Sequence, residues 1–257
     1  MVLTLDIGNT HTVIGGFLEG ELKFVSRLST NAKKTEDEYA ALLYDIFRLE
    51  KVEKPRVQGA IISSVVPALN QTMTAALKKV CGITPMIVGP GVKSGVNLLV
   101  DNPQQVGADL VCAAAAVAEL YSTPALVVDM GTATKLSVID ENGAFRGVSI
   151  GPGVQMGMAA LSGGTAQLPQ ISLDAPKTVI GRNTVECMQS GVVYGNACLI
   201  DGMAQRIEEE FGMTLNRIAT GGIAKFIIPH CRLDFTVDND LILKGLYYIF
   251  EKNKKNI

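Results

Sequence analysis

The stretch Asp6-Ile7-Gly8-Asn9-Thr10-His11-Thr12 decides the fold, because its pattern returns 123 positions later as Asp129-Met130-Gly131-Thr132-Ala133-Thr134. Each stretch follows an apolar run typical of a buried strand, then places a carboxylate, a glycine and small polar residues at the strand end. The glycine lets backbone N–H groups approach phosphate oxygens, and the carboxylate can hold a cation. One copy is equally compatible with a turn capped by its own aspartate. Two copies predict a duplicated domain that binds one nucleotide.

The predicted elements also repeat, since each half opens with three strands before helices and strands alternate. Predicted strands cover residues 2–7, 12–17, 21–28, 59–65 and 85–88, and then 125–129, 134–140, 144–150 and 217–220. Predicted helices begin at Thr35, where Glu38 completes a capping box, and cover 67–80, 106–120, 155–162 and 184–211, the last as one helix or two. This order predicts the α/β class with a mixed sheet in each half. We place two domains at residues 1–119 and 120–257.

Composition excludes several classes of protein. The 257 residues are 47% hydrophobic with a formal net charge of −2, which allows a full core and indicates no nucleic-acid partner. The apolar runs are too short for a membrane span, and the strand-like start leaves no room for a signal peptide. Five cysteines without a C-x-x-C pair predict reduced thiols in a cytoplasmic protein. With two histidines, zinc is not expected.

Two further segments carry candidate chemistry. Gly221 and Gly222 join a predicted strand to a helix, which suits either a nucleotide resting on backbone or a plain tight turn. The loop at 102–109 ends at Asp109, near the start of an Ala-rich helix. A carboxylate there can accept a proton from a substrate hydroxyl, or it can simply favour the helix dipole. The residues alone leave both alternatives open.

Taken together, these motifs resemble the type III pantothenate kinases, within the acetate kinase–Hsp70–actin-like superfamily. The resemblance runs nearly end to end. It includes the two aspartate turns, Asn102-Pro103 with Gly107-Ala108-Asp109, Gly151-Pro152-Gly153, Thr184 with Met188-Gln189-Ser190-Gly191, and Thr220-Gly221-Gly222. It implies two RNase H-like, actin-like ATPase domains with mixed five-stranded sheets and a nucleotide cleft between them. The implied reaction moves the γ-phosphoryl group of ATP to pantothenate and gives 4′-phosphopantothenate, the first step towards coenzyme A.

The resemblance also implies a role for each matching position. Asp109 is the implied proton acceptor, Asp6 lies near Mg²⁺, and Asp129 holds a monovalent cation, K⁺ or NH₄⁺. The implied ATP-binding residues are Asp6, Ile7, Gly8, Asn9, Thr10, His11, Thr12, Val13, Gly131, Thr132, Gly221 and Gly222. The implied pantothenate pocket contains Val100, Gly107, Ala108, Asp109, Leu110 and Thr184, with Thr184 reaching across a homodimer interface. The stripe of Met188, Val192, Tyr194 and Leu199 suits that interface or ordinary core packing.

Three positions depart from the family pattern. Leu110 stands where the family usually has an arginine that contacts pantothenate, Val100 stands where a tyrosine is common, and Lys135 follows Thr134 where the motif often ends Thr-Thr. Loss of an arginine paired with a carboxylate costs about 1.5–3 kcal/mol. Lys135 either supplies compensating charge or points to solvent. The alternatives to pantothenate phosphorylation are therefore a related kinase for another small hydroxylated acceptor and a non-catalytic nucleotide-binding regulator.

Overall fold

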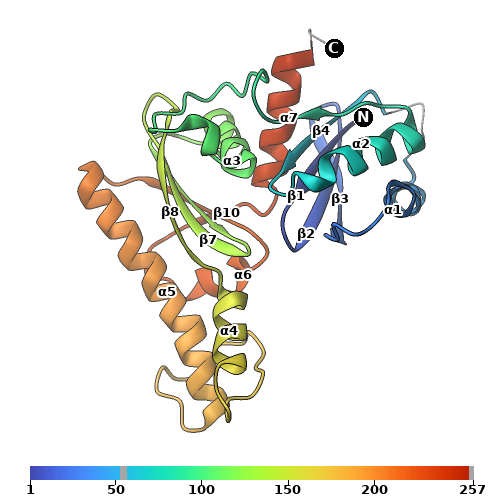
Figure 1. Cartoon of the computed structure of the whole chain (residues 1–257). Coiled ribbons are helices and arrows are strands. Elements are labelled where there is room, and N and C mark those ends of the chain that lie inside the picture. The colour runs from blue at the N-terminus through green and yellow to red at the C-terminus, as the bar shows by residue number, and fades with distance from the viewer. Residues whose placement is uncertain (53–56, 255–257) are drawn as a thin grey trace. The chain divides into compact units, whose positions relative to one another are not determined.

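The chain forms two compact units, each built on one five-stranded sheet (Figure 1). The structure is a computed structural model that describes residues 1–52 and 57–254. The first unit contains Met1–Leu120 and the chain from Leu241 onward, and the second contains Tyr121–Asp240. The first sheet contains β1 (Val2–Ile7), β2 (His11–Leu18), β3 (Glu21–Ser29), β4 (Gly59–Ser64) and β5 (Met86–Ile87). The second contains β6 (Ala125–Met130), β7 (Ala133–Ile139), β8 (Phe145–Pro152), β9 (Asn216–Thr220) and β10 (Thr236–Val237).

The two sheets share one topology, which confirms the predicted α/β class with a mixed sheet in each half. The strand order is β3-β2-β1-β4-β5 in the first sheet, and the second has the matching order β8-β7-β6-β9-β10. In each sheet, the first three strands pair antiparallel, and the remaining two are parallel to the first. The short strand β10 was not predicted, because a two-residue strand carries no periodic signal.

The helices mostly begin and end close to their predicted limits. They are α1 (Glu36–Leu49), α2 (Ala68–Cys81), α3 (Ala108–Leu120), α4 (Val154–Gly163), α5 (Thr184–Phe211), α6 (Ala224–Ile227) and α7 (Leu241–Asn253), with 3₁₀ turns η2 (Pro103–Gln105) and η3 (Ile228–His230). The capping box of Thr35 and Glu38 is present at the start of α1. Helix α5 is one continuous helix of 28 residues, which settles the choice between one helix and two. Helix α7 was not predicted.

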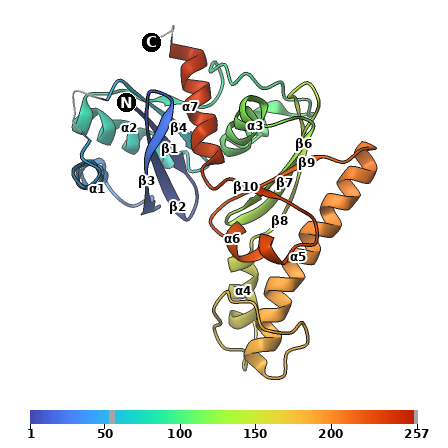
Figure 2. The ribbon, with the colours of Figure 1, turned by 180° about the vertical axis from the view of Figure 1, so that it is seen from behind.

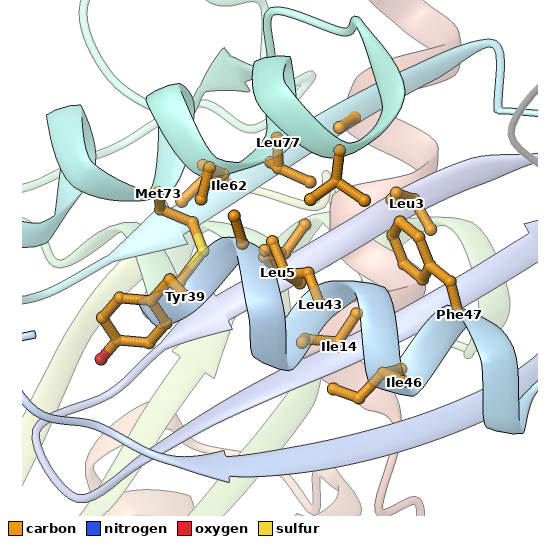
Figure 3. Close-up of a cluster of buried hydrophobic side chains, with 14 of the residues drawn as sticks. Leu3, Leu5, Ile14, Tyr39, Leu43, Ile46, Phe47, Ile62, Met73 and Leu77 are labelled. Carbon is orange, nitrogen blue, oxygen red and sulfur yellow. The ribbon is translucent and has the colours of Figure 1, made fainter. Parts of the chain in front are cut away.

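The side chains of the first sheet alternate between its two faces, and each face packs against a different pair of helices. Leu3, Leu5 and Ile62 pack with α1 and α2, as Figure 3 shows. Val2, Phe17 and Ile61 pack with α3 and α7 on the other face. Because successive side chains of a strand point to opposite faces, the even-numbered residues of β1 lie on the α3 side. Asp6 is therefore placed on the face that α3 covers.

Helix α7 belongs with the first unit, although residues 241–257 were assigned to the second predicted domain. It packs against α3, β1 and β4, and its Leu246, Ile249 and Phe250 lie in the same core cluster as Cys112. Gly245 permits this contact, since an added Cβ would lie 1.8 Å from the Cys112 carbonyl oxygen. The predicted boundary near residue 120 coincides with the junction of the two units, but the chain returns to the first unit at Leu241.

The second sheet is covered on one face by α5 and α6. Leu126, Val128 and Met130 of β6 pack there with Val193 and Ala197 of α5. Figures 1 and 2 both show α4 lying alongside the N-terminal part of α5. Asp129 alternates with the residues of this core and therefore lies on the opposite face of the sheet. Within the described part of the chain, every helix is too short or too polar to cross a membrane.

Candidate active site

The first aspartate turn connects β1 to β2 and leaves its polar tip exposed. The Gly8 N–H donates to the His11 carbonyl oxygen over 3.0 Å, which closes the turn. Asn9, Thr10 and His11 are exposed, whereas Ile7 and Thr12 are buried and anchor the turn to the sheet. A turn with buried ends and an exposed backbone tip suits the binding of phosphate oxygens.

Asp6 occupies a defined position at the end of β1. It lies opposite Val13 on β2 and opposite Ser63 on β4. The Ser63 hydroxyl donates to Asp6 Oδ1 over 3.0 Å, which orients the half-buried carboxylate. Such a carboxylate, with exposed polar groups nearby, matches the oxygen-rich donor set that Mg²⁺ prefers when it also binds substrate phosphates. The chemistry of these residues fits the Mg²⁺ expected at Asp6.

Asp109 lies in the first turn of α3, beside Gly107. Its Oδ1 accepts a hydrogen bond of 2.9 Å from the Leu110 N–H. A Cβ added at Gly107 would lie only 2.5 Å from the same oxygen, so the carboxylate uses space that only a glycine leaves open. The carboxylate is partly exposed. The arrangement presents an acidic group that is held at the helix start and can still reach a substrate.

The Cys112 thiol of α3 interacts with the carboxylates of both Asp6 and Asp109 in the first unit. Burial raises the pKa of the Cys112 thiol well above its usual range, and the nearby carboxylates of Asp6 and Asp109 raise this pKa further. A hydrogen bond with Ser63 acts in the opposite direction. The helix geometry agrees, since Cys112 lies one turn after Asp109 on α3 and packs against the face of the sheet that carries Asp6. Two carboxylates 103 positions apart in the sequence, on β1 and on α3, thus belong to the same face of the first unit.

The second aspartate turn has the same construction in the second unit. The Gly131 N–H donates to the Ala133 carbonyl oxygen over 3.1 Å, and Thr132 is exposed at the tip. Gly221 packs against this turn with φ +95°, and an added Cβ there would lie 2.5 Å from the Met130 carbonyl oxygen. Gly222 is exposed next to it. The second unit therefore brings together the two predicted glycine motifs at 131 and 221.

The aspartate of the second turn has a different neighbour from its counterpart. Lys135 lies directly opposite Asp129 on β7, and its Nζ contacts Asp129 Oδ2 at 2.7 Å. Lys135 therefore does not point to solvent, and its ammonium forms an ion pair with this carboxylate.

Thr184 lies in the second unit, at the start of α5. It is exposed and lines a cavity of about 900 Å³ between α4 and α5. The lining is largely apolar, with Val154, Met158 and Met188, but Arg182 adds a cation. The Asn183 side chain caps the helix by accepting from the Glu186 N–H over 3.0 Å.

The remaining predicted pocket residues differ in accessibility. Val100 is half-buried just before η2, and Ala108 is half-buried at the start of α3. Leu110 is buried, with 6% of its surface exposed. A leucine at this position therefore packs in the protein interior.

Three residues of these sites were missed by sequence reasoning: Ser63 and Cys112 lie near Asp6, and Arg182 lines the cavity with Thr184. Gly153 belongs to a motif of the resemblance, and its N–H braces the second turn by donating to the Thr132 carbonyl oxygen over 3.2 Å. Ser63 could have been identified as a site residue, because it is a polar residue near the end of a predicted strand, as Asp6 is. Cys112 could not, because a buried thiol in an Ala-rich helix is typical core.

Comparisons with known structures agree with the duplicated fold. An activator of the 2-hydroxyisocaproyl-CoA dehydratase from Clostridium difficile with bound ADPNP matches with a TM-score of 0.56 and 15% identity, covering 100% of this chain and 97% of that one. Component A of the (R)-2-hydroxyglutaryl-CoA dehydratase from Acidaminococcus fermentans matches with a TM-score of 0.57 and 14% identity, covering 96% and 95%. The duplicated sheets thus define a protein of the actin-like ATPase fold.

Sequence comparison is more specific. Residues 2–206 match the family described as type III pantothenate kinase. The type III pantothenate kinase of Halalkalibacterium halodurans is 41% identical over 253 residues, which cover 98% of this chain and 100% of that protein. The chain belongs to the type III pantothenate kinase family, and it is an ATP-dependent kinase. The resemblance drawn from the motifs is thereby confirmed, as are the expected fold class and activity.

Proposed function

We propose that this kinase transfers the γ-phosphoryl group of ATP to the primary hydroxyl of pantothenate, with Asp109 as the base and Asp6 as the ligand of Mg²⁺. The observation that carries the assignment is geometric: Asp6 lies on the face of the first sheet that α3 covers, and Asp109 stands in the first turn of that helix. Phosphoryl transfer depends mainly on positioning and charge neutralisation, so a cation-binding carboxylate and a base are needed near each other. The position of Asp6 and Asp109 on the same face of the first sheet supports these two roles.

The nucleotide residues divide between the two units. In the first unit, the turn that follows Gly8 has Asn9, Thr10 and His11 exposed and offers N–H and hydroxyl groups to phosphate oxygens. In the second, we propose the same role for Gly131, Thr132, Gly221 and Gly222. Mg²⁺ bound at Asp6 would neutralise charge on the phosphates.

Asp109 accepts the proton of the acceptor hydroxyl in the proposed reaction. The hydroxyl oxygen forms a bond to the γ-phosphorus, the bond from this phosphorus to the β–γ bridging oxygen breaks, and ADP leaves with that electron pair. The proton passes to the Asp109 carboxylate. Gly107 leaves room for this carboxylate, and the hydrogen bond from the Leu110 N–H holds it in place before the substrate arrives.

The acceptor pocket is proposed to include Thr184 of a second copy of the chain. Apolar side chains lie exposed around α4 and the start of α5: Met156, Leu161, Val179, Ile180 and Val185. A second copy would cover them. Only part of the apolar stripe on α5 is available for such an interface. Val192 packs in the core of its own unit, whereas Leu199 is 45% exposed. The five cysteines form no disulfide, which supports a reducing, cytoplasmic location.

The proposed roles are tested by ADP release with and without pantothenate. Asp109→Asn should lower kcat by about 10²–10⁴, as expected for loss of a general base. Asp45→Asn on the exposed face of α1 is the matched control and should leave kcat unchanged. Normal turnover by a folded Asp109→Asn variant would remove Asp109 from the mechanism. Turnover with other small alcohols but not with pantothenate would refute the acceptor.

A further inference from the structure

We propose that Lys135 provides a built-in positive charge at the second aspartate turn, so that this chain needs no monovalent cation at Asp129. The K⁺ or NH₄⁺ expected there does not fit the residues present. Oδ2 of Asp129 already contacts the Lys135 ammonium at 2.7 Å, and only 15% of the lysine side chain and 10% of the aspartate side chain are exposed.

Strand register builds this pair into the fold. Asp129 on β6 lies directly opposite Lys135 on β7, and Thr220 lies opposite Asp129 on β9. Side chains of directly opposed residues lie on the same face and within reach of each other. The ammonium therefore reaches the carboxylate from the adjacent strand, without help from a flexible loop.

The duplicated fold provides an internal comparison. Asp6 and Asp129 are each the penultimate residue of the first strand of their sheet, and each lies opposite a hydroxyl residue on the parallel neighbour, Ser63 or Thr220. They differ on the antiparallel neighbour, where Asp6 faces Val13 and Asp129 faces Lys135. An apolar neighbour leaves cation binding to an ion from solution, whereas a lysine supplies the charge itself.

Physical chemistry favours the tethered charge over a free ion. A buried carboxylate is costly unless its charge is compensated close by. An ammonium is a compact point charge like a monovalent metal ion, and its attachment to β7 avoids the loss of translational freedom that binding a free ion entails. A cation from solution would have to displace Lys135 into a less favourable position.

The test compares chloride salts of K⁺ and tetramethylammonium at constant ionic strength. For the unaltered protein, both the thermal midpoint and kcat should be the same in the two salts, with kcat agreeing within about twofold. Lys135→Met should lose at least about tenfold in kcat without K⁺, and saturating K⁺ should restore both its activity and its thermal midpoint. Lys79→Met is the matched control, since it breaks an exposed Lys–Asp ion pair with Asp37 and should show no response to K⁺.

The double variant Asp129→Asn/Lys135→Met removes both charges. It should fold and show no response of its thermal midpoint to K⁺, because no carboxylate remains to bind the ion. The activity measurement rests on the proposed function, but the thermal measurement does not. A failure of the proposed function can therefore be distinguished from a failure of the role proposed for Lys135. A saturable rise of the thermal midpoint of the unaltered protein with K⁺, absent in Asp129→Asn, would overturn the inference. So would a Lys135→Met variant that is fully active and equally stable in both salts.

Discussion

Replacement of Gly107 by alanine should slow the reaction without weakening the fold. The added Cβ would lie 2.5 Å from Asp109 Oδ1, and ordinary contact begins at 3.4 Å, so the carboxylate oxygen must move by about 0.9 Å. A misplacement of about 1 Å in a catalytic group costs on the order of 10²-fold in rate. We therefore expect kcat to fall about 100-fold, which corresponds to about 2.7 kcal/mol in the barrier.

Stability should change little or rise, because the backbone of Gly107 lies outside the left-handed region and its nearest obstacle is a movable side-chain oxygen. Alanine in place of glycine stabilises a compatible site by about 0.4–1 kcal/mol through the unfolded state. ADP release measures the rate, and urea unfolding measures the stability. Gly89→Ala in the same unit is the control, since an added Cβ there meets nothing within 4 Å.

A double variant separates positioning from general damage. If Gly107 acts through Asp109, the combination of Gly107→Ala with Asp109→Asn should be no slower than Asp109→Asn alone. Fully additive losses would show that Gly107 acts elsewhere. A Gly107→Ala variant with normal kcat would refute the claim that this carboxylate must stay where the structure places it.

Three further predictions concern the second unit. Gly221→Ala should cost about 1–3 kcal/mol in urea unfolding, because φ is +95° and a backbone carbonyl oxygen lies 2.5 Å from the added Cβ; unchanged stability would contradict the geometry. Burial and the hydrogen bond to Asp238 raise the pKa of Tyr121 to about 12, so the unfolded chain loses this proton first and stability should fall as the pH rises from about 10 towards 12. Urea titrations should show that Tyr121→Phe lacks this fall. Light scattering should show a dimer that Ile180→Asp converts to monomers, while Leu49→Asp, equally exposed but on α1, remains dimeric.

The two aspartate turns could be predicted from the sequence because their pattern lies within a few consecutive residues. A strand that ends in Asp6, Gly8 and polar residues carries its whole pattern within a few positions, and the repeat at Asp129 identified the duplication. The capping box at Thr35 was likewise predictable, since its two partners are three residues apart. By contrast, α7 was not predicted, and the unit to which it belongs depends on its contact with α3.

The sequence by itself determined the two turns and the sheet class, because these depend on spacing and on short-range hydrogen bonds. It also determined which charged residues were candidates for the site. Only the tertiary structure decided which of those residues are neighbours. Alternation along β1 placed Asp6 on the face covered by α3, and this brought it near Asp109. Register between β6 and β7 turned Lys135, which could have pointed to solvent, into the partner of Asp129. Such meetings depend on strand pairing and helix packing, which set the distances between residues that the order of the chain leaves open.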